Sequence, residues 1–130
     1  MAEKILMIDT CVLIDYFRKK DKSNSKLVQI ADRFEQIAIS SITEFEIYTG
    51  ATPDQRSFRK SMLFEVLVIS FDSSAAHYAA EIQQDLKRRR YAIDKADLFI
   101  AATAIANDTL FYTLNRKHFD KISELDLLSH

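Results

Sequence analysis

Short apolar runs alternate along this chain with segments in which apolar residues recur at helical spacing. The short runs predict buried strands at 4–8, 37–40, 66–71 and 110–113. The helical spacing predicts helices at 12–18, 26–35, 43–49 and 94–106, one more after Pro53, and a long one capped by Ser73. Gly50 is predicted to end the helix at 43–49, and the segment after Phe119 fits a short edge strand.

This alternation predicts the fold class. One Gly and one Pro in the whole chain leave little material for tight hairpins, which argues against an all-β fold. Short apolar strands that alternate with helices pair in parallel, and helices then cover both faces of the sheet. We therefore expect an α/β protein with three layers, α/β/α, around a central parallel sheet of four or five strands. No linker, repeat or low-complexity segment divides residues 1–130, which predicts a single domain.

Acidic and amide side chains stand where the predicted strands end. Asp9 directly follows the first strand, Glu46 lies just past the second and Asn115 follows the fourth, while Asp97 begins the helix that leads into the fourth strand. Ligands of parallel sheets bind beyond the carboxyl ends of the strands, so these side chains are expected to meet. Carboxylates that meet repel each other, and a hard divalent cation such as Mg²⁺ relieves the repulsion. Such an ion suits phosphodiester hydrolysis.

Each acid also has a purely structural explanation. Asp97 can be a favourable charge in the first turn of its helix, with Asp94 as the N-cap. Glu44 and Glu46 both fit the last position of a capping box. Asp9 has no predicted capping role, which makes it the acid with the weakest structural explanation. Spacing alone leaves both readings open.

Composition narrows the class of protein. A hydrophobic content of 48% and a charged content of 28% are ordinary for a soluble globular protein. No apolar stretch approaches the ~20 residues that span a bilayer, and no signal peptide is recognisable. A single cysteine fits a reducing compartment. The chain is therefore predicted to be cytoplasmic, with no membrane partner.

Motifs of other catalytic classes are missing. The sequence has no glycine-rich phosphate loop, no closely spaced Cys or His pair for zinc and no nucleophile elbow around a serine. The net charge of -1 gives no general basic field, but two basic clusters lie at 18–22 and 87–90. Either cluster can contact phosphates or can be a solvated helix end.

Four motifs occur in order along almost the whole chain. They are Asp9-Thr10 after a strand, Thr43-x-x-Glu46-Ile-x-x-Gly50, Asp97-x-x-Ile-Ala-Ala-Thr-Ala, and Thr113-x-Asn115-x-x-His118-Phe119. Together they resemble the motif set of PIN-domain proteins, most closely that of the VapC-like toxins of type II toxin–antitoxin pairs. The resemblance implies an endoribonuclease that depends on Mg²⁺ or Mn²⁺. It also implies an RNA substrate, a homodimer and a cognate antitoxin protein.

The resemblance assigns roles by position. Asp9 and Asp97 match the principal metal ligands, and Glu46 matches the acidic residue that binds the ion through water or positions the attacking water. Glu44 lies between motif positions, as a capping-box partner of Ser41 or a solvent acid. The implied metal site is therefore Asp9, Glu46 and Asp97.

The remaining site residues are expected to support these acids. The hydroxyls of Thr10 and Thr113 match positions that orient the acids or the waters, and Asp94 is an accessory acid one turn before Asp97. Asn115 completes the catalytic set. For contacts with the RNA backbone we name Lys87, Arg88 and Arg89.

The chain departs from the resemblance at two places. The tail motif often carries a fourth acid, but this chain has Asn115 and His118 there. Asn adds no negative charge, so we predict one well-bound ion. His118 is interpreted as a packing or surface residue, with contact to a phosphate as the alternative. Cys11, where the family often has Asn, is interpreted as packing rather than as a thiolate.

Two other functions compete. The alternative within the same fold is a catalytically inactive PIN scaffold that binds RNA or protein. The second is a phosphorelay receiver, which would need another acid beside Asp9 and a lysine after the last strand. Thr10 and Cys11 follow Asp9, and Lys117 is poorly placed, which argues against a receiver.

Overall fold

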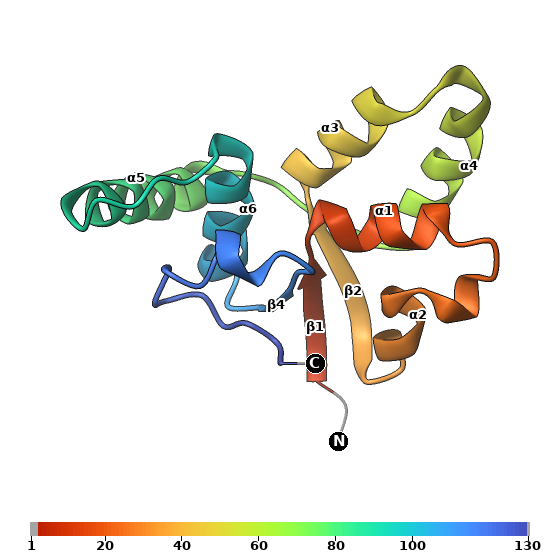
Figure 1. Ribbon diagram of the computed structural model, residues 1–130, viewed down its shortest axis with the longest axis horizontal. Coiled ribbons are helices and arrows are strands. Elements are labelled where there is room, and N and C mark those ends of the chain that lie inside the picture. Colours follow the sequence, from red (N-terminus) through yellow and green to blue (C-terminus); the bar gives the residue numbers. More distant parts are fainter. Residues whose placement is uncertain (1–2, 130) are drawn as a thin grey trace.

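A four-stranded, all-parallel sheet runs through the centre of the protein (Figure 1). The computed structural model describes residues 3–129. The strands are β1 (Glu3–Ile8), β2 (Phe34–Ser40), β3 (Leu67–Ile69) and β4 (Leu110–Tyr112). Their order is β3-β2-β1-β4, so the direction in which strands are added reverses at β1. Ligand crevices of parallel sheets form at such a reversal, which here lies beyond the carboxyl ends of β1 and β4.

Helices cover both faces of the sheet, as predicted. They are α1 (Thr10–Arg18), α2 (Lys26–Ala31), α3 (Ser41–Gly50), α4 (Pro53–Leu63), α5 (Ser73–Arg88) and α6 (Lys95–Ala106), with short 3₁₀ turns η1 (Lys22–Asn24) and η2 (Arg116–His118). Successive residues of β1 point to opposite faces. Met7 packs into a core with α5 and α6, whereas Leu6 and Ile8 pack into a second core with the first four helices. The three-layer α/β/α architecture is confirmed.

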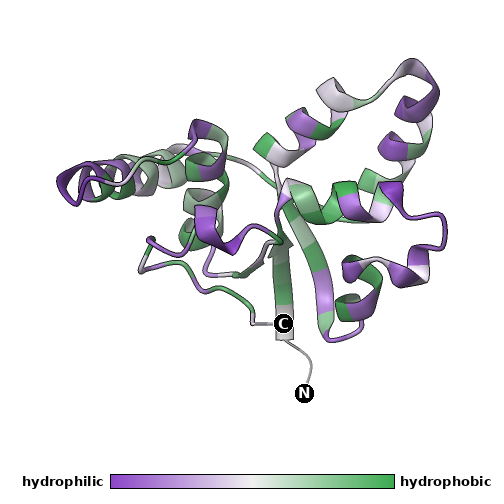
Figure 2. Cartoon of the chain, in the orientation of Figure 1, coloured by the Kyte–Doolittle hydropathy of each residue, from purple (hydrophilic) through white to green (hydrophobic). Residues whose placement is uncertain are grey.

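Hydropathy follows this layering. Most of β1 and the second half of β2 are apolar, whereas the start of β2 and many helical turns far from the sheet are polar (Figure 2). Helix α6 is the most buried of the helices, with Leu98, Ile100 and Ala101 almost completely enclosed. Burial on this scale holds the first turn of α6 in place at the edge of the sheet. Among the described helices, none is both long and apolar enough to cross a membrane.

The predicted boundary between the second helix and the second strand was wrong. Helix α2 ends at Ala31, and β2 begins at Phe34 rather than at Ile37. Phe34 lies at helical spacing from Ile30, but it pairs across from Glu3 in the sheet and is buried there. Pairing with β1 therefore overrides the helical spacing, which is the usual outcome when an aromatic residue fits either element.

Several smaller expectations also changed. Asp72, and not Ser73, caps α5, because its carboxylate accepts a hydrogen bond from the Ala75 N–H at 3.0 Å. Gly50 is the last residue of α3 and does not adopt a positive φ. The tail forms a single parallel bridge, from Leu127 to Phe111, instead of a fifth strand.

Candidate metal centre

Asp9 lies at the end of β1 and is held by hydrogen bonds to both of its carboxylate oxygens. Oδ1 accepts from the Thr10 N–H at 2.8 Å, and Oδ2 accepts from Thr113 Oγ1 at 2.8 Å and from Cys11 Sγ at 3.4 Å. The residue is only 4% exposed. The expectation that Asp9 has no capping role was wrong, because Oδ1 caps α1. These hydrogen bonds from Thr10 and Thr113 fix the orientation of the Asp9 carboxylate.

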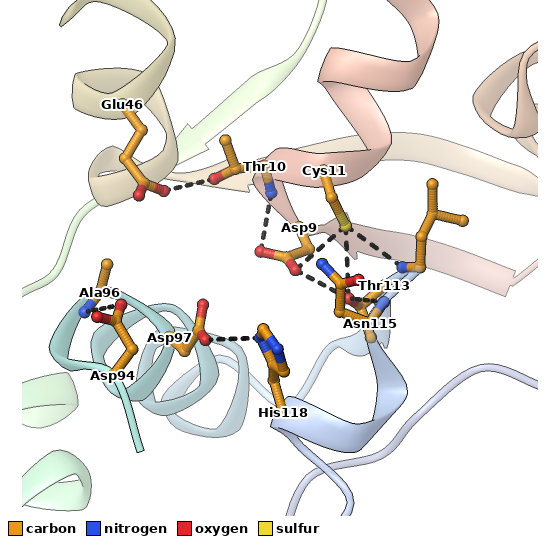
Figure 3. A network of polar contacts seen from close by, with 11 residues as sticks. Asp9, Thr10, Cys11, Glu46, Asp94, Ala96, Asp97, Thr113, Asn115 and His118 are labelled. Atoms are coloured by element: carbon orange, nitrogen blue, oxygen red, sulfur yellow. Dashed lines mark hydrogen bonds and ion pairs between the residues drawn. The ribbon is translucent and has the colours of Figure 1, made fainter. Parts of the chain in front are cut away.

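Glu46 on α3 reaches the same region through Thr10. The Thr10 hydroxyl donates to Glu46 Oε1 at 2.7 Å, while its backbone N–H binds Asp9 (Figure 3). One residue therefore joins the two acids. The buried Thr43 hydroxyl lies 3.0 Å from that of Thr10 and completes the contact. Thr43 was missed as a site residue, although its position one helical turn before Glu46 signals a shared face.

Neither glutamate of α3 belongs to a capping box. Ser40 caps the helix, and its hydroxyl accepts from the Ile42 N–H at 3.0 Å. Ser41 instead accepts from the Phe71 N–H at 3.1 Å. Glu44 is thus a partly exposed surface acid, one of its two expected roles, and Glu46 is free to serve the site.

Asp97 stands in the first turn of α6, three residues after the N-cap Asp94, whose carboxylate accepts from the Ala96 N–H at 3.1 Å. Burial, together with the negative charges of Asp9 and Asp94, raises the pKa of the Asp97 carboxyl to about 6. His118 opposes this shift but does not cancel it. Asp94 therefore has the expected structural role and also adds charge to the site.

His118 lies at the surface, one of its expected roles, and contacts an acid of the site. Its Nδ1 lies 3.2 Å from Asp97 Oδ2, with the imidazole 59% exposed and the carboxylate 20% exposed. Asn115 begins the turn η2 that carries His118, and its N–H donates to Thr113 Oγ1 at 3.0 Å. Both residues of the tail motif are therefore at the site, as Figure 3 shows.

Cys11 is a half-buried thiol at the start of α1. Burial, together with the neighbouring charge of Asp9, raises the pKa of the Cys11 thiol to about 11. The Leu114 N–H donates to its sulfur at 3.3 Å, which joins the start of α1 to the segment after β4. The interpretation as packing is supported, because a thiol with this pKa stays protonated near neutral pH.

Apart from His118 beside Asp97, the acids of the site have no cationic partner among the residues that the structure describes. In the part of the chain that the structure describes, no Lys or Arg forms an ion pair with Asp9, Glu46 or Asp97. Between residues 3 and 129, no group of three or more His, Cys, Asp and Glu side chains is close enough to hold one ion. Mg²⁺ usually binds through one or two carboxylates and several waters, so Asp9 and Asp97 suit it without a closed cage.

The basic residues named for RNA contact lie at the exposed end of α5. Arg88 and Arg89 bind the two oxygens of Asp85 at 2.6 and 2.7 Å, and Arg89 also donates to the backbone oxygen of Lys121 at 2.7 Å. Two of the three predicted cations are thus engaged within the protein.

Comparison with known proteins agrees with this architecture. The chain is 35% identical over 133 residues to ribonuclease VapC1 of Methanocaldococcus jannaschii, covering 96% of this chain and 86% of that protein. It is 26% identical to a chain of the Rickettsia felis VapBC2 structure bound to promoter DNA, with a TM-score of 0.79 over 95% of this chain and 97% of that one. A chain of the DNA-bound VapBC structure from Salmonella typhimurium has the same fold, with 21% identity and a TM-score of 0.83 over 98% of both chains. The family model of the PIN domain matches residues 6–125, and this chain therefore belongs to the PIN domain family.

Proposed function

We propose that this protein is an endoribonuclease dependent on Mg²⁺ or Mn²⁺, and the toxin of a toxin–antitoxin pair. Residues 1–130 would act as one PIN domain in the cytoplasm. The observation that carries the proposal is the uncompensated charge around Asp97, whose pKa is raised to about 6 by burial and by Asp9 and Asp94. A cation between these acids would remove that cost.

Each side chain of the site has its own proposed role. Asp9 and Asp97 would hold the ion, and Thr113 would keep Asp9 in the orientation that its 2.8 Å hydrogen bond shows. A bound divalent ion would lower the pKa of water and offset charge on the phosphoryl oxygens. Glu46, aligned by Thr10, would orient the attacking water, and Asn115 would complete the polar wall.

The relatives support the choice of substrate and partner. VapC1 of M. jannaschii is named a ribonuclease, and the similar chain from R. felis was solved as part of VapBC2. A protein partner also suits the surface of α3 and α4, where Phe45, Phe58 and Phe64 are exposed. We infer that this chain cleaves RNA, forms a homodimer and is held inactive by a cognate antitoxin.

The decisive experiment compares wild type with Asp9→Ala. Purified wild-type protein should cleave RNA with Mg²⁺ or Mn²⁺ and not with EDTA, and its expression should stop growth. Asp9→Ala should lose both effects. If wild type binds RNA without cutting it, and its expression leaves growth unchanged, the protein is instead an inactive binding module.

A further inference from the structure

A hollow of about 290 Å³ opens beside the metal centre, where the end of α5, the start of α6 and the turn η2 meet. Asp94, Asp97 and His118 line it and belong also to the metal centre. Lys117 and Lys121 line it as well. Its volume lies just below the roughly 300–1,000 Å³ of small-molecule pockets. A group of nucleotide size fits such a space, whereas a folded protein segment does not.

The hollow also has an apolar wall. Leu86 and Ile122 are buried behind it, and Ile93 and the 43% exposed Tyr91 line it. The Lys121 ammonium lies 5.2 Å from the centre of the Tyr91 ring, within the range of a cation–π contact. Tyr91 therefore forms part of the apolar wall and also holds the Lys121 charge beside it.

The two lysines differ from the other basic residues of this region. Among residues 3–129, neither Lys117 nor Lys121 has a carboxylate oxygen within 4.0 Å of its ammonium group. Arg88 and Arg89, by contrast, share Asp85. The hollow thus presents unpaired positive charge directly beside the acids of the metal centre.

A hollow with lysines, acids and an apolar wall favours a ligand whose negative charge and apolar surface lie on different groups. A purely acidic peptide would be repelled by Asp94 and Asp97, and a purely basic one by the two lysines. A nucleotide instead carries its charge on the phosphate and has a neutral planar base that buries apolar surface.

We propose that the hollow binds the nucleotide next to the cleaved bond of a single-stranded RNA. The phosphate contacts Lys117 and Lys121, and the base packs against Tyr91 and Ile93. This rests on the proposed ribonuclease function. It assigns RNA contact to the η2 side of the site rather than to Lys87 and Arg88.

The test is fluorescence anisotropy with a labelled single-stranded oligouridine of about 12 nucleotides, a length within the range of single-strand sites. EDTA is present to prevent metal-dependent cleavage. Lys121→Ala should weaken binding about 5-fold or more and reduce the slope of log Kd against log salt by about 0.7, the contribution of one phosphate contact. Tyr91→Ala should weaken binding about 5-fold or more, through loss of base packing.

Matched variants separate contact from folding. Lys60→Ala removes the same charge from α4, where Lys60 lines a different surface depression, and it should change Kd less than about 2-fold. Lys121→Arg and Tyr91→Phe keep the charge and the ring, and both should bind like wild type. Thermal melts that match wild type would show that the weakened variants are folded.

The outcomes distinguish this inference from the proposed function. If wild type cuts RNA with metal but Lys121→Ala and Tyr91→Ala bind and cut as well as wild type, the inference is wrong and the function stands. If wild type does not cut RNA at all, the proposed function fails on its own. If Lys121→Ala releases a co-purified protein partner and leaves RNA binding unchanged, the hollow serves a protein and the inference is overturned.

Discussion

The charged residues at the end of α5 and those at the carboxyl edge of the sheet are treated by the fold in opposite ways. Asp85 is exposed, and the hydrogen bond from Arg89 lowers its pKa, with Arg88 acting in the same direction. Asp97 is half-buried beside other acids, and its pKa rises to about 6. The charge of Asp85 is balanced within the protein, whereas that of Asp97 is offset only in part by His118, and a bound cation would balance it. Side chains with strongly shifted pKa values cluster at functional sites, and Asp97 is such a side chain.

The largest expected difference between the two regions concerns activity. Asp97→Ala should reduce metal-dependent RNA cleavage by more than about 100-fold, because even outer partners of metal ligands cost 10–100-fold. Asp85→Ala removes the same carboxylate from the balanced region and should cleave at the wild-type rate. The measurement is initial rates with Mn²⁺ at matched protein concentrations. Equal losses in both variants would contradict the contrast.

The second-largest effect on cleavage is expected from Thr10, which joins Asp9 to Glu46. Thr10→Val removes the hydroxyl that donates to Glu46 at 2.7 Å and should reduce cleavage about 10- to 100-fold. Thr10→Ser keeps the hydroxyl and should retain most of the activity. Because the Thr10 N–H that Asp9 caps is unchanged in both, thermal stability should be similar. Cleavage by Thr10→Val at the wild-type rate would show that Glu46 needs no alignment.

Without metal, the ionised Asp97 carboxylate should lower the free energy of unfolding. The folded pKa of Asp97 is about 6, above the ordinary 3.8, so the folded protein binds the proton more tightly than the unfolded chain. Stability in EDTA should therefore fall as pH rises from about 4 to about 6, and Asp97→Asn should weaken this dependence. At pH 7 in EDTA the variant should be about 1–3 kcal/mol more stable by urea unfolding, because a shift of about two pKa units corresponds to about 3 kcal/mol and solvent screening of the partly exposed carboxylate reduces it. Saturating Mn²⁺ should remove or reverse the difference, since only wild type gains from binding.

The smallest expected effect is on stability, from the Arg88–Asp85 ion pair at the end of α5. Arg88→Ala breaks the exposed pair with Asp85 at 2.6 Å, but Arg89 still binds that carboxylate. Exposed pairs are worth about 0.2–1 kcal/mol, so the loss should be at the low end of that range. Urea unfolding at low and high salt is the measurement. A loss above about 2 kcal/mol would mean that this end of α5 is not the simple surface that its exposure indicates.

Local patterns were enough to predict the elements and to choose between candidate acids. The apolar runs located all four strands, and the motif spacing preferred Glu46 to Glu44. The structure then left Glu44 at the surface and joined Glu46 to Thr10. Errors arose where distant partners decided the outcome. Phe34 joined the sheet because β1 was available to pair with it, and its helical spacing carried no information about that.

The site was only partly predictable for the same reason. The contact of His118 with Asp97 joins residues 21 positions apart, and that of Thr113 with Asp9 joins residues 104 positions apart. No local spacing reports such pairs.

The sequence by itself determined that parallel strands alternate with helices, and that acids follow the strands where ligands bind. It did so because apolar periodicity and residue type act over a few neighbouring positions. Only the tertiary structure decided which polar groups contact one another. Asp9 caps α1, Thr10 forms hydrogen bonds with two acids, and Asp97 lies near other negative charges. Burial and electrostatic energy depend on distance in space, and folding alone sets that distance.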